Sequence, residues 1–223
     1  MDLAARLDHL RTDAAAFAHA IDTGDLDAHV PSCPDWCLSD LGWHVIEVHD
    51  FWKWVVQLET LDPSGYPEPE RVIDDDLVST FEKGAEEFFE VLAAVKPETE
   101  LWTWSHERNG GFVQRFQVQE MALHRWDAQY TVGPPEPLDP DVALEGLAIF
   151  AEFLVPPNVD GAFVVQPEGG KPLVVGGLEP VAVLSGDPSD LLLALWRRLP
   201  IGPFVTNGDP DTAKAYLDTI AFG

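Results

Sequence analysis

Residues 112–130 read FVQRFQVQEMALHRWDAQY. The apolar residues of this stretch recur every three or four positions, which predicts an amphipathic helix. Two acids, Glu120 and Asp127, interrupt the face that this spacing turns inward. His124 follows Glu120 by four residues, so the two side chains lie one turn apart on the same face. A carboxylate inside a helical bundle is costly unless it is paired or bound to a metal ion, so Glu120 needs a partner.

Three segments before this helix carry the same apolar spacing. Their stripes cover residues 3–21, 38–55 and 77–95, and loops rich in proline or glycine separate them. Together with the helix at 112–130 they predict a four-helix bundle. We expect a fifth helix to begin at Asp139-Pro140, because aspartate is a favoured N-cap and proline is favoured in the first turn.

The character of the sequence changes after Pro156-Pro157. Short runs of β-branched residues predict strands at 162–166, 173–175 and 181–184. Gly-Asp-Pro then occurs twice, at 186–188 and 208–210, where a strand would end at glycine and aspartate would cap a helix. We therefore expect an α+β protein, with a helical bundle at residues 1–157 and a small α+β domain at residues 158–223.

The charge of the chain excludes several classes of partner. Lys and Arg total 13 against 39 Asp and Glu, which gives a net charge of −26. Such a surface repels nucleic-acid phosphates and anionic lipids, so we expect neither as a partner. No apolar run approaches the roughly 20 residues of a membrane helix, and the N-terminus does not resemble a signal peptide. We therefore expect a cytoplasmic protein.

Glu120 and His124 have two interpretations. In the first, both side chains bind a metal ion from one helix, and Asp127 accepts the second imidazole N–H of His124. In the second, Glu120 is a buried hydrogen-bond partner of His124 or forms an ion pair with Arg115 or Arg125, while Asp127 merely pairs with Arg125. The residues alone leave both interpretations open.

A third metal ligand has to come from another helix. The segment 38–55 carries His44 and His49 on the two flanks of its apolar stripe, and periodicity does not choose between them. Each is also compatible with an ordinary half-buried histidine. The acids of segment 77–95 lie away from its apolar stripe, so the four-carboxylate set of a di-iron bundle is missing. We therefore expect a mononuclear site.

Four short motifs, in their order and spacing, resemble a known family. They are VPSCPDW at 30–36, LGWH at 41–44, EMALHRWD at 120–127 and LWRRLP at 195–200. Together they are similar to the mycothiol-dependent maleylpyruvate isomerase family. The resemblance implies a DinB-like four-helix bundle followed by a small α+β domain.

The resemblance also implies a metal site. His44, Glu120 and His124 match the family's ligands for one zinc ion per chain, whereas His49 does not match. Two histidines and one glutamate leave a fourth position open, which is typical of a catalytic zinc. A thiol that enters this position loses its proton near neutral pH and becomes a nucleophile. The family implies that the thiol is mycothiol, as cofactor or co-substrate.

The sequence therefore predicts a zinc- and mycothiol-dependent thiol transferase or isomerase that acts on an electrophilic small molecule. Two alternatives remain, a hydrolase in which the metal activates water and a non-catalytic module that holds a metal or small ligand. The resemblance suggests that Arg197 or Arg198 reaches the substrate, although a surface role fits equally well. We also expect Arg115 or Arg125 to keep the pocket locally positive. No further catalytic residue is predicted.

The two cysteines, Cys33 and Cys37, are too few for a disulfide framework or a zinc–thiolate cage. Family members commonly carry threonine or serine where Cys37 stands, in a capping pattern that ends in an acid, here Asp40. We therefore expect Cys37 near the start of a helix, whose macrodipole favours a thiolate. Cys37 is then either a reactive thiol or a passive substitution, and the Cys33–Cys37 pair receives no function.

Overall fold

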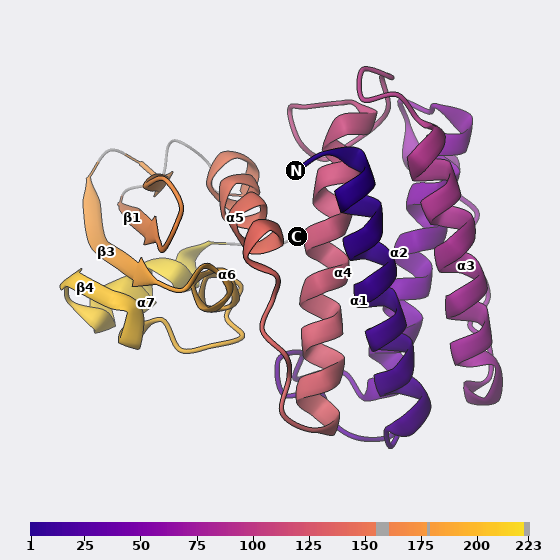
Figure 1. Ribbon diagram of the computed structural model, residues 1–223, viewed down its shortest axis with the longest axis horizontal. Coiled ribbons are helices and arrows are strands. Elements are labelled where there is room, and N and C mark those ends of the chain that lie inside the picture. The colour runs from indigo at the N-terminus through magenta and orange to yellow at the C-terminus, as the bar shows by residue number, and fades with distance from the viewer. Residues whose placement is uncertain (155–160, 178, 221–223) are drawn as a thin grey trace. The chain divides into compact units, whose positions relative to one another are not determined.

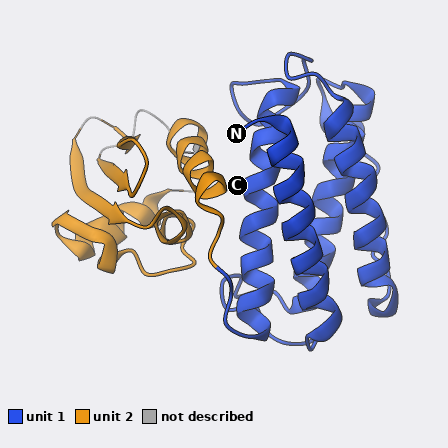
Figure 2. Cartoon of the chain, in the orientation of Figure 1, with its two compact units in different colours: residues 1–136 blue, residues 137–223 orange. Residues whose placement is uncertain are grey.

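The computed structural model describes residues 1–154, 161–177 and 179–220. The chain divides into two compact units, residues 1–136 and residues 137–223 (Figure 2). The boundary expected between residues 157 and 158 lies outside the described residues. The observed division comes earlier because the helix that begins at Pro140 packs within the second unit.

The first unit is a bundle of four long helices, as the apolar stripes predict (Figure 1). These are α1 (Leu3–Thr23), α2 (Leu38–Leu58), α3 (Asp74–Ala94) and α4 (Gly110–Val132), with a short 3-10 helix at Pro63–Gly65. In the core, the rings of Phe17 and Phe81 pack with centroids 4.9 Å apart. Within the described part of the chain, no helix combines the length and apolar character needed to cross a membrane.

Helix α4 is buried around most of its circumference, because it contacts α1, α2 and α3. Asp127, on the predicted inward face, has no exposed surface, and Leu123 on the same face is buried. The prediction of the inward face was wrong at the C-terminal end of the helix, because Tyr130 is 44% exposed. Gln117 and Gln119 are also buried, which a single apolar stripe does not predict.

The second unit combines helices with a four-stranded sheet in the order β2-β1-β3-β4. Its strands are β1 (Ala162–Pro167), β2 (Leu173–Gly176), β3 (Pro180–Gly186) and β4 (Val205–Gly208). Its helices are α5 (Pro140–Ile149), α6 (Pro188–Leu195) and α7 (Pro210–Thr219), with a π-helical turn at Phe150–Leu154 and a 3-10 helix at Gly202–Phe204. Strand β1 pairs antiparallel with β2 and parallel with β3, and β4 pairs antiparallel with β3. The α+β fold class is therefore confirmed.

The three expected aspartate caps are present in the second unit. Asp139 and Asp187 each accept hydrogen bonds from two backbone N–H groups in the first turn of α5 and α6, and Asp209 accepts one from the backbone N–H of Thr212 in α7. Helix α5 packs against α6, and the backbone N–H of Leu138 donates to Ser189 Oγ at 2.9 Å. These contacts explain why α5 belongs to the second unit.

Candidate metal site

The start of α2 places His44 in the second turn of that helix. Cys37 is the N-cap residue, and its backbone N–H donates to Asp40 Oδ2 at 3.0 Å. The Cys37 thiol donates to the same oxygen at 3.0 Å, and Arg71 donates to Asp40 Oδ1 at 2.6 Å. This capping box defines the beginning of the helix, and therefore the face on which His44 lies.

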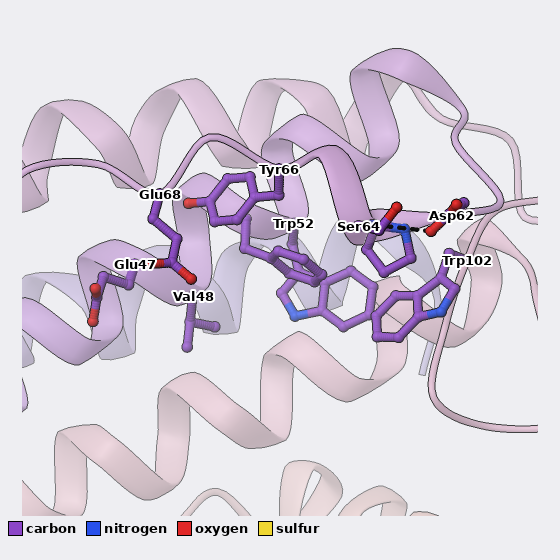
Figure 3. A pocket seen from close by; sticks show the side chains of 10 residues that line it. Glu47, Val48, Trp52, Asp62, Ser64, Tyr66, Glu68 and Trp102 are labelled. Atoms are coloured by element: carbon purple, nitrogen blue, oxygen red, sulfur yellow. Dashed lines mark hydrogen bonds between the residues drawn. The ribbon is translucent and has the colours of Figure 1, made fainter.

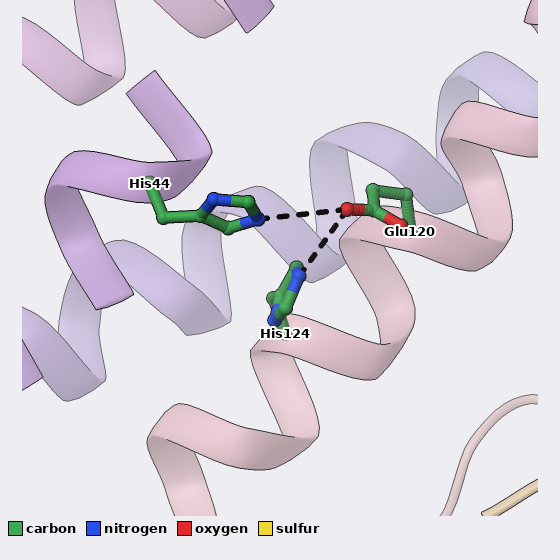
Figure 4. A group of neighbouring side chains, drawn as sticks. All are labelled: His44, Glu120 and His124. Carbon is green, nitrogen blue, oxygen red and sulfur yellow. Dashed lines mark ion pairs between the residues drawn. The ribbon is translucent and has the colours of Figure 1, made fainter. Parts of the chain in front are cut away.

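Three side chains from α2 and α4 converge inside the bundle (Figure 4). His124 Nε2 lies 3.2 Å from Glu120 Oε1, and His44 Nε2 lies 3.8 Å from the same oxygen. One nitrogen or oxygen atom from each residue lies within 4.8 Å of the other two. The structure therefore brings together the three residues that the sequence predicts as ligands.

The donor set suits a zinc ion. Zinc binds imidazole nitrogen and carboxylate oxygen at about 2.0–2.1 Å, so tetrahedral ligand atoms stand about 3.3–3.4 Å from one another. The separations of 3.2 and 3.8 Å between Glu120 and the two histidines are close to that spacing. Three protein ligands would leave one coordination position for another molecule.

His49, the other histidine of α2, lies away from this cluster. Its ring packs against Phe88 with centroids 5.0 Å apart, and Phe81 and Phe89 are also in contact. Burial is the main cause that lowers the pKa of His49 to about 3, so this histidine is neutral. It is a core residue of the bundle.

Asp127 orients His124. The side chain of Asp127 is fully buried, and its Oδ2 atom lies 3.0 Å from His124 Nδ1. A carboxylate accepts from Nδ1–H, so this hydrogen bond leaves the Nε2 atom of His124 available toward Glu120. The arrangement is the carboxylate–histidine pair that commonly supports a metal-binding imidazole.

The charges within the cluster reinforce one another. Burial raises the pKa of Glu120, but the contacts with His124 and His44 outweigh it and hold that pKa well below its usual range. Burial lowers the pKa of His124, but the bonds to Asp127 and Glu120 outweigh it and raise that pKa to about 9. These contacts favour the protonated form of His124, and a metal ion that binds His124 would take the place of that proton.

Trp36 forms one wall of the site. Its ring centroid lies 4.7 Å from that of His44 and 6.5 Å from that of His124. The two imidazoles are themselves 5.0 Å apart, edge to face. Sequence reasoning did not assign Trp36 a role, although it belongs to the VPSCPDW motif. Its contact with His124 depends on tertiary structure.

The two arginines of α4 have partners outside the three-residue cluster. Arg115 donates to Glu107 Oε2 at 2.6 Å. Arg125 is buried, and it donates to Asp13 at 3.0 Å and to the backbone carbonyl of Glu136 at 2.6 Å. A role for either arginine beside the His44–Glu120–His124 cluster stays a prediction.

Arg197 and Arg198 belong to the second unit. Arg197 has a φ of 61° in the left-handed region, and its Nη2 donates at 2.6 Å to the carbonyls of both Leu217 and Ile220. These bonds satisfy carbonyls at the end of α7. Arg198 places its guanidinium 5.9 Å from the ring centroid of Trp196. A substrate contact for either arginine stays a prediction.

The fold and the cluster together define a class, an α+β protein whose helical bundle carries a candidate mononuclear metal site. Residues 7–129 match the family model described as the mycothiol maleylpyruvate isomerase N-terminal domain, and residues 141–215 match the MDMPI C-terminal domain. The chain belongs to the mycothiol-dependent maleylpyruvate isomerase family, and it is an enzyme of that family.

Two crystal structures share the fold. One is of the mycothiol-dependent maleylpyruvate isomerase, with 13% identity, a TM-score of 0.63, and coverage of 93% of this chain and 92% of that chain. The other is of a histidine-to-alanine mutant of that enzyme, with 13% identity, a TM-score of 0.62, and coverage of 86% and 88%. No curated protein matches the chain.

Proposed function

We propose that this protein is a zinc-dependent enzyme that uses mycothiol to act on an electrophilic small molecule, as an isomerase or a thiol transferase. The observation that carries this proposal is the convergence of His44, Glu120 and His124 in a chain of this family. Two imidazoles and one carboxylate are the donors of a catalytic zinc site with one open position.

When bound at these donors, zinc supplies a Lewis acid that lowers the pKa of a thiol in the open position. The residues of the chain have separate tasks around it. Glu120 provides the negative charge of the ligand set, and Asp127 holds Nε2 of His124 toward that set. Trp36 places an apolar ring beside His44 and near His124 on one side of the set.

The thiol and the electrophile come from the family and from the names of the structural neighbours, which are mycothiol-dependent maleylpyruvate isomerase. Maleylpyruvate is therefore the first electrophile to assay. The fate of the thiol adduct separates the two reactions. An isomerase releases the thiol and regenerates it, whereas a thiol transferase leaves it attached to the product.

Cobalt(II) in place of zinc tests the proposal, because cobalt reports its ligands in the visible spectrum. Titration with mycothiol should produce a sulfur-to-cobalt charge-transfer band, and the S-methyl analogue should not produce it. Conversion of the electrophile should also require the thiol. No band together with conversion that proceeds equally without thiol would favour a hydrolase, and binding without any conversion would favour a non-catalytic module.

A further inference from the structure

A groove of 640 Å³ lies along α2 and the loop that follows it (Figure 3). Its apolar walls are four aromatic side chains, Phe51, Trp52, Tyr66 and Trp102. Three acids also line it, namely Glu47, Asp62 and Glu68. We call this feature the aromatic–acidic groove. None of its lining residues is a Lys or Arg, and none belongs to the candidate metal cluster.

The aromatic side chains form a connected wall. The Phe51 ring meets those of Tyr66 and Trp102 edge to face, with centroids 5.1 and 5.6 Å apart. The Trp52 and Trp102 centroids are 5.9 Å apart. The backbone N–H of Trp102 donates to the Thr60 carbonyl at 2.7 Å, which ties the segment before α4 to the end of α2. The wall is therefore built from three parts of the chain.

The acids give the groove an uncompensated negative charge. The carboxylates of Glu47 and Glu68 form no ion pair among the described residues, and Figure 3 shows both at one end of the groove. At the other end, Asp62 accepts from the backbone N–H of Ser64 at 3.0 Å. Tyr66 donates its hydroxyl to Asp50 at 2.9 Å, so the hydroxyl already has a partner, and the residue also lines the groove.

Aromatic ring faces and unpaired carboxylates both attract cations. The face of an aromatic ring attracts a cation through its quadrupole, and a carboxylate attracts it through charge. The same groove repels an anion. We propose that the aromatic–acidic groove binds an organic cation, an ammonium group attached to an apolar or aromatic body.

This inference goes beyond the proposed function and does not need a metal ion. Glu47 and Val48 are three and four residues after His44 on α2, and Phe51 is seven residues after it. The groove therefore continues the helix face that carries His44, one turn further along.

Isothermal titration with benzyltrimethylammonium tests the proposal, with benzyl alcohol and phenylacetate as neutral and anionic probes. We expect saturable binding of the cation only. The double substitution Glu47→Gln/Glu68→Gln should weaken it about tenfold or more, and Trp102→Leu about fivefold or more. The matched control is Glu90→Gln/Glu98→Gln, which makes the same charge change at two exposed acids outside the groove.

Three results would overturn the proposal. The first is that the cation shows no saturable binding up to about 10 mM. The second is that phenylacetate binds as tightly as the cation. The third is that the control pair weakens binding as much as the groove pair does, which would assign binding to overall charge. Circular dichroism confirms folding, and the glutamate pair keeps the test decisive if Trp102→Leu does not fold. Zinc content and thiol-dependent conversion, measured on the same variants, test the proposed function separately.

Discussion

Asp127 Oδ2 lies 3.0 Å from His124 Nδ1, and the two residues are one turn apart on α4. The Asp127 side chain is fully buried, so its carboxylate has no contact with water. The hydrogen bond with His124 offsets part of the free-energy cost of that burial. A buried carboxylate in this position is expected where an imidazole must keep one orientation. The pair therefore fixes the orientation of the His124 ring within the cluster.

We expect Asp127→Asn to weaken zinc binding about 10- to 100-fold, because the amide no longer favours the His124 tautomer that presents Nε2. Competition with a chelator of known zinc affinity measures the change. The exposed acid Asp22 offers a control in Asp22→Asn. Unchanged zinc affinity in a folded Asp127→Asn protein would make this hydrogen bond a purely structural one.

The wild-type protein should contain about one zinc ion per chain when it is purified without chelator. His44→Ala removes one of three ligands and should lose most of that zinc. His49→Leu is the matched control on the same helix, because His49 lies among phenylalanines outside the cluster. Elemental analysis decides the matter. Full retention of zinc by His44→Ala would remove His44 from the site.

Replacing both cysteines should leave most of the activity. An external thiol supplies the nucleophile in the proposed function, so Cys33 and Cys37 are not needed for it. Serine is a good N-cap, so Cys37→Ser should keep the capping box with Asp40. Turnover by the Cys33→Ser/Cys37→Ser protein is compared with wild type at equal zinc content. Loss of turnover in the folded double variant would identify Cys37 as catalytic.

The buried ion pair between Arg125 and Asp13 should stabilise the folded protein. Both side chains are largely buried, and their Nε and Oδ1 atoms lie 3.0 Å apart. Arg125→Leu leaves a buried carboxylate without its partner, which should lower the free energy of unfolding by about 3–5 kcal/mol. Arg11→Ala breaks the exposed pair with Glu86 and should cost less than about 1 kcal/mol. Urea unfolding measures both. An equally small loss for Arg125→Leu would contradict the structural role.

Asp40 should make stability depend on pH in acid. The hydrogen bond from Arg71 and then those from Cys37 lower the pKa of Asp40 from 3.8 to about 2. Since the pKa is depressed in the folded state, the stabilisation is present above the usual pKa and is lost as the pH falls toward 2. The difference in unfolding free energy between wild type and Asp40→Asn should therefore shrink as the pH falls through this window. A constant difference would assign the effect to packing.

The sequence by itself determined the elements of this protein, because their signals are local. The apolar stripes predicted α1 to α4. The capping residues Asp139, Asp187 and Asp209 predicted where α5, α6 and α7 begin. The spacing of Glu120 and His124 also predicted that they share a helix face. The family was predicted from motifs and confirmed over residues 7–129 and 141–215.

Only the tertiary structure decided which residues meet across elements. Periodicity placed His44 and His49 on opposite flanks of one stripe, and only the family resemblance favoured His44. The packing of α2 against α4 set His44 beside Glu120, and the packing of α2 against α3 set His49 among phenylalanines. Arg125 forms a hydrogen bond with Asp13, which lies 112 residues earlier in the sequence. No local sequence pattern predicts this contact. Helical periodicity specifies the direction of a side chain relative to its own axis, whereas its partner depends on how the helices pack.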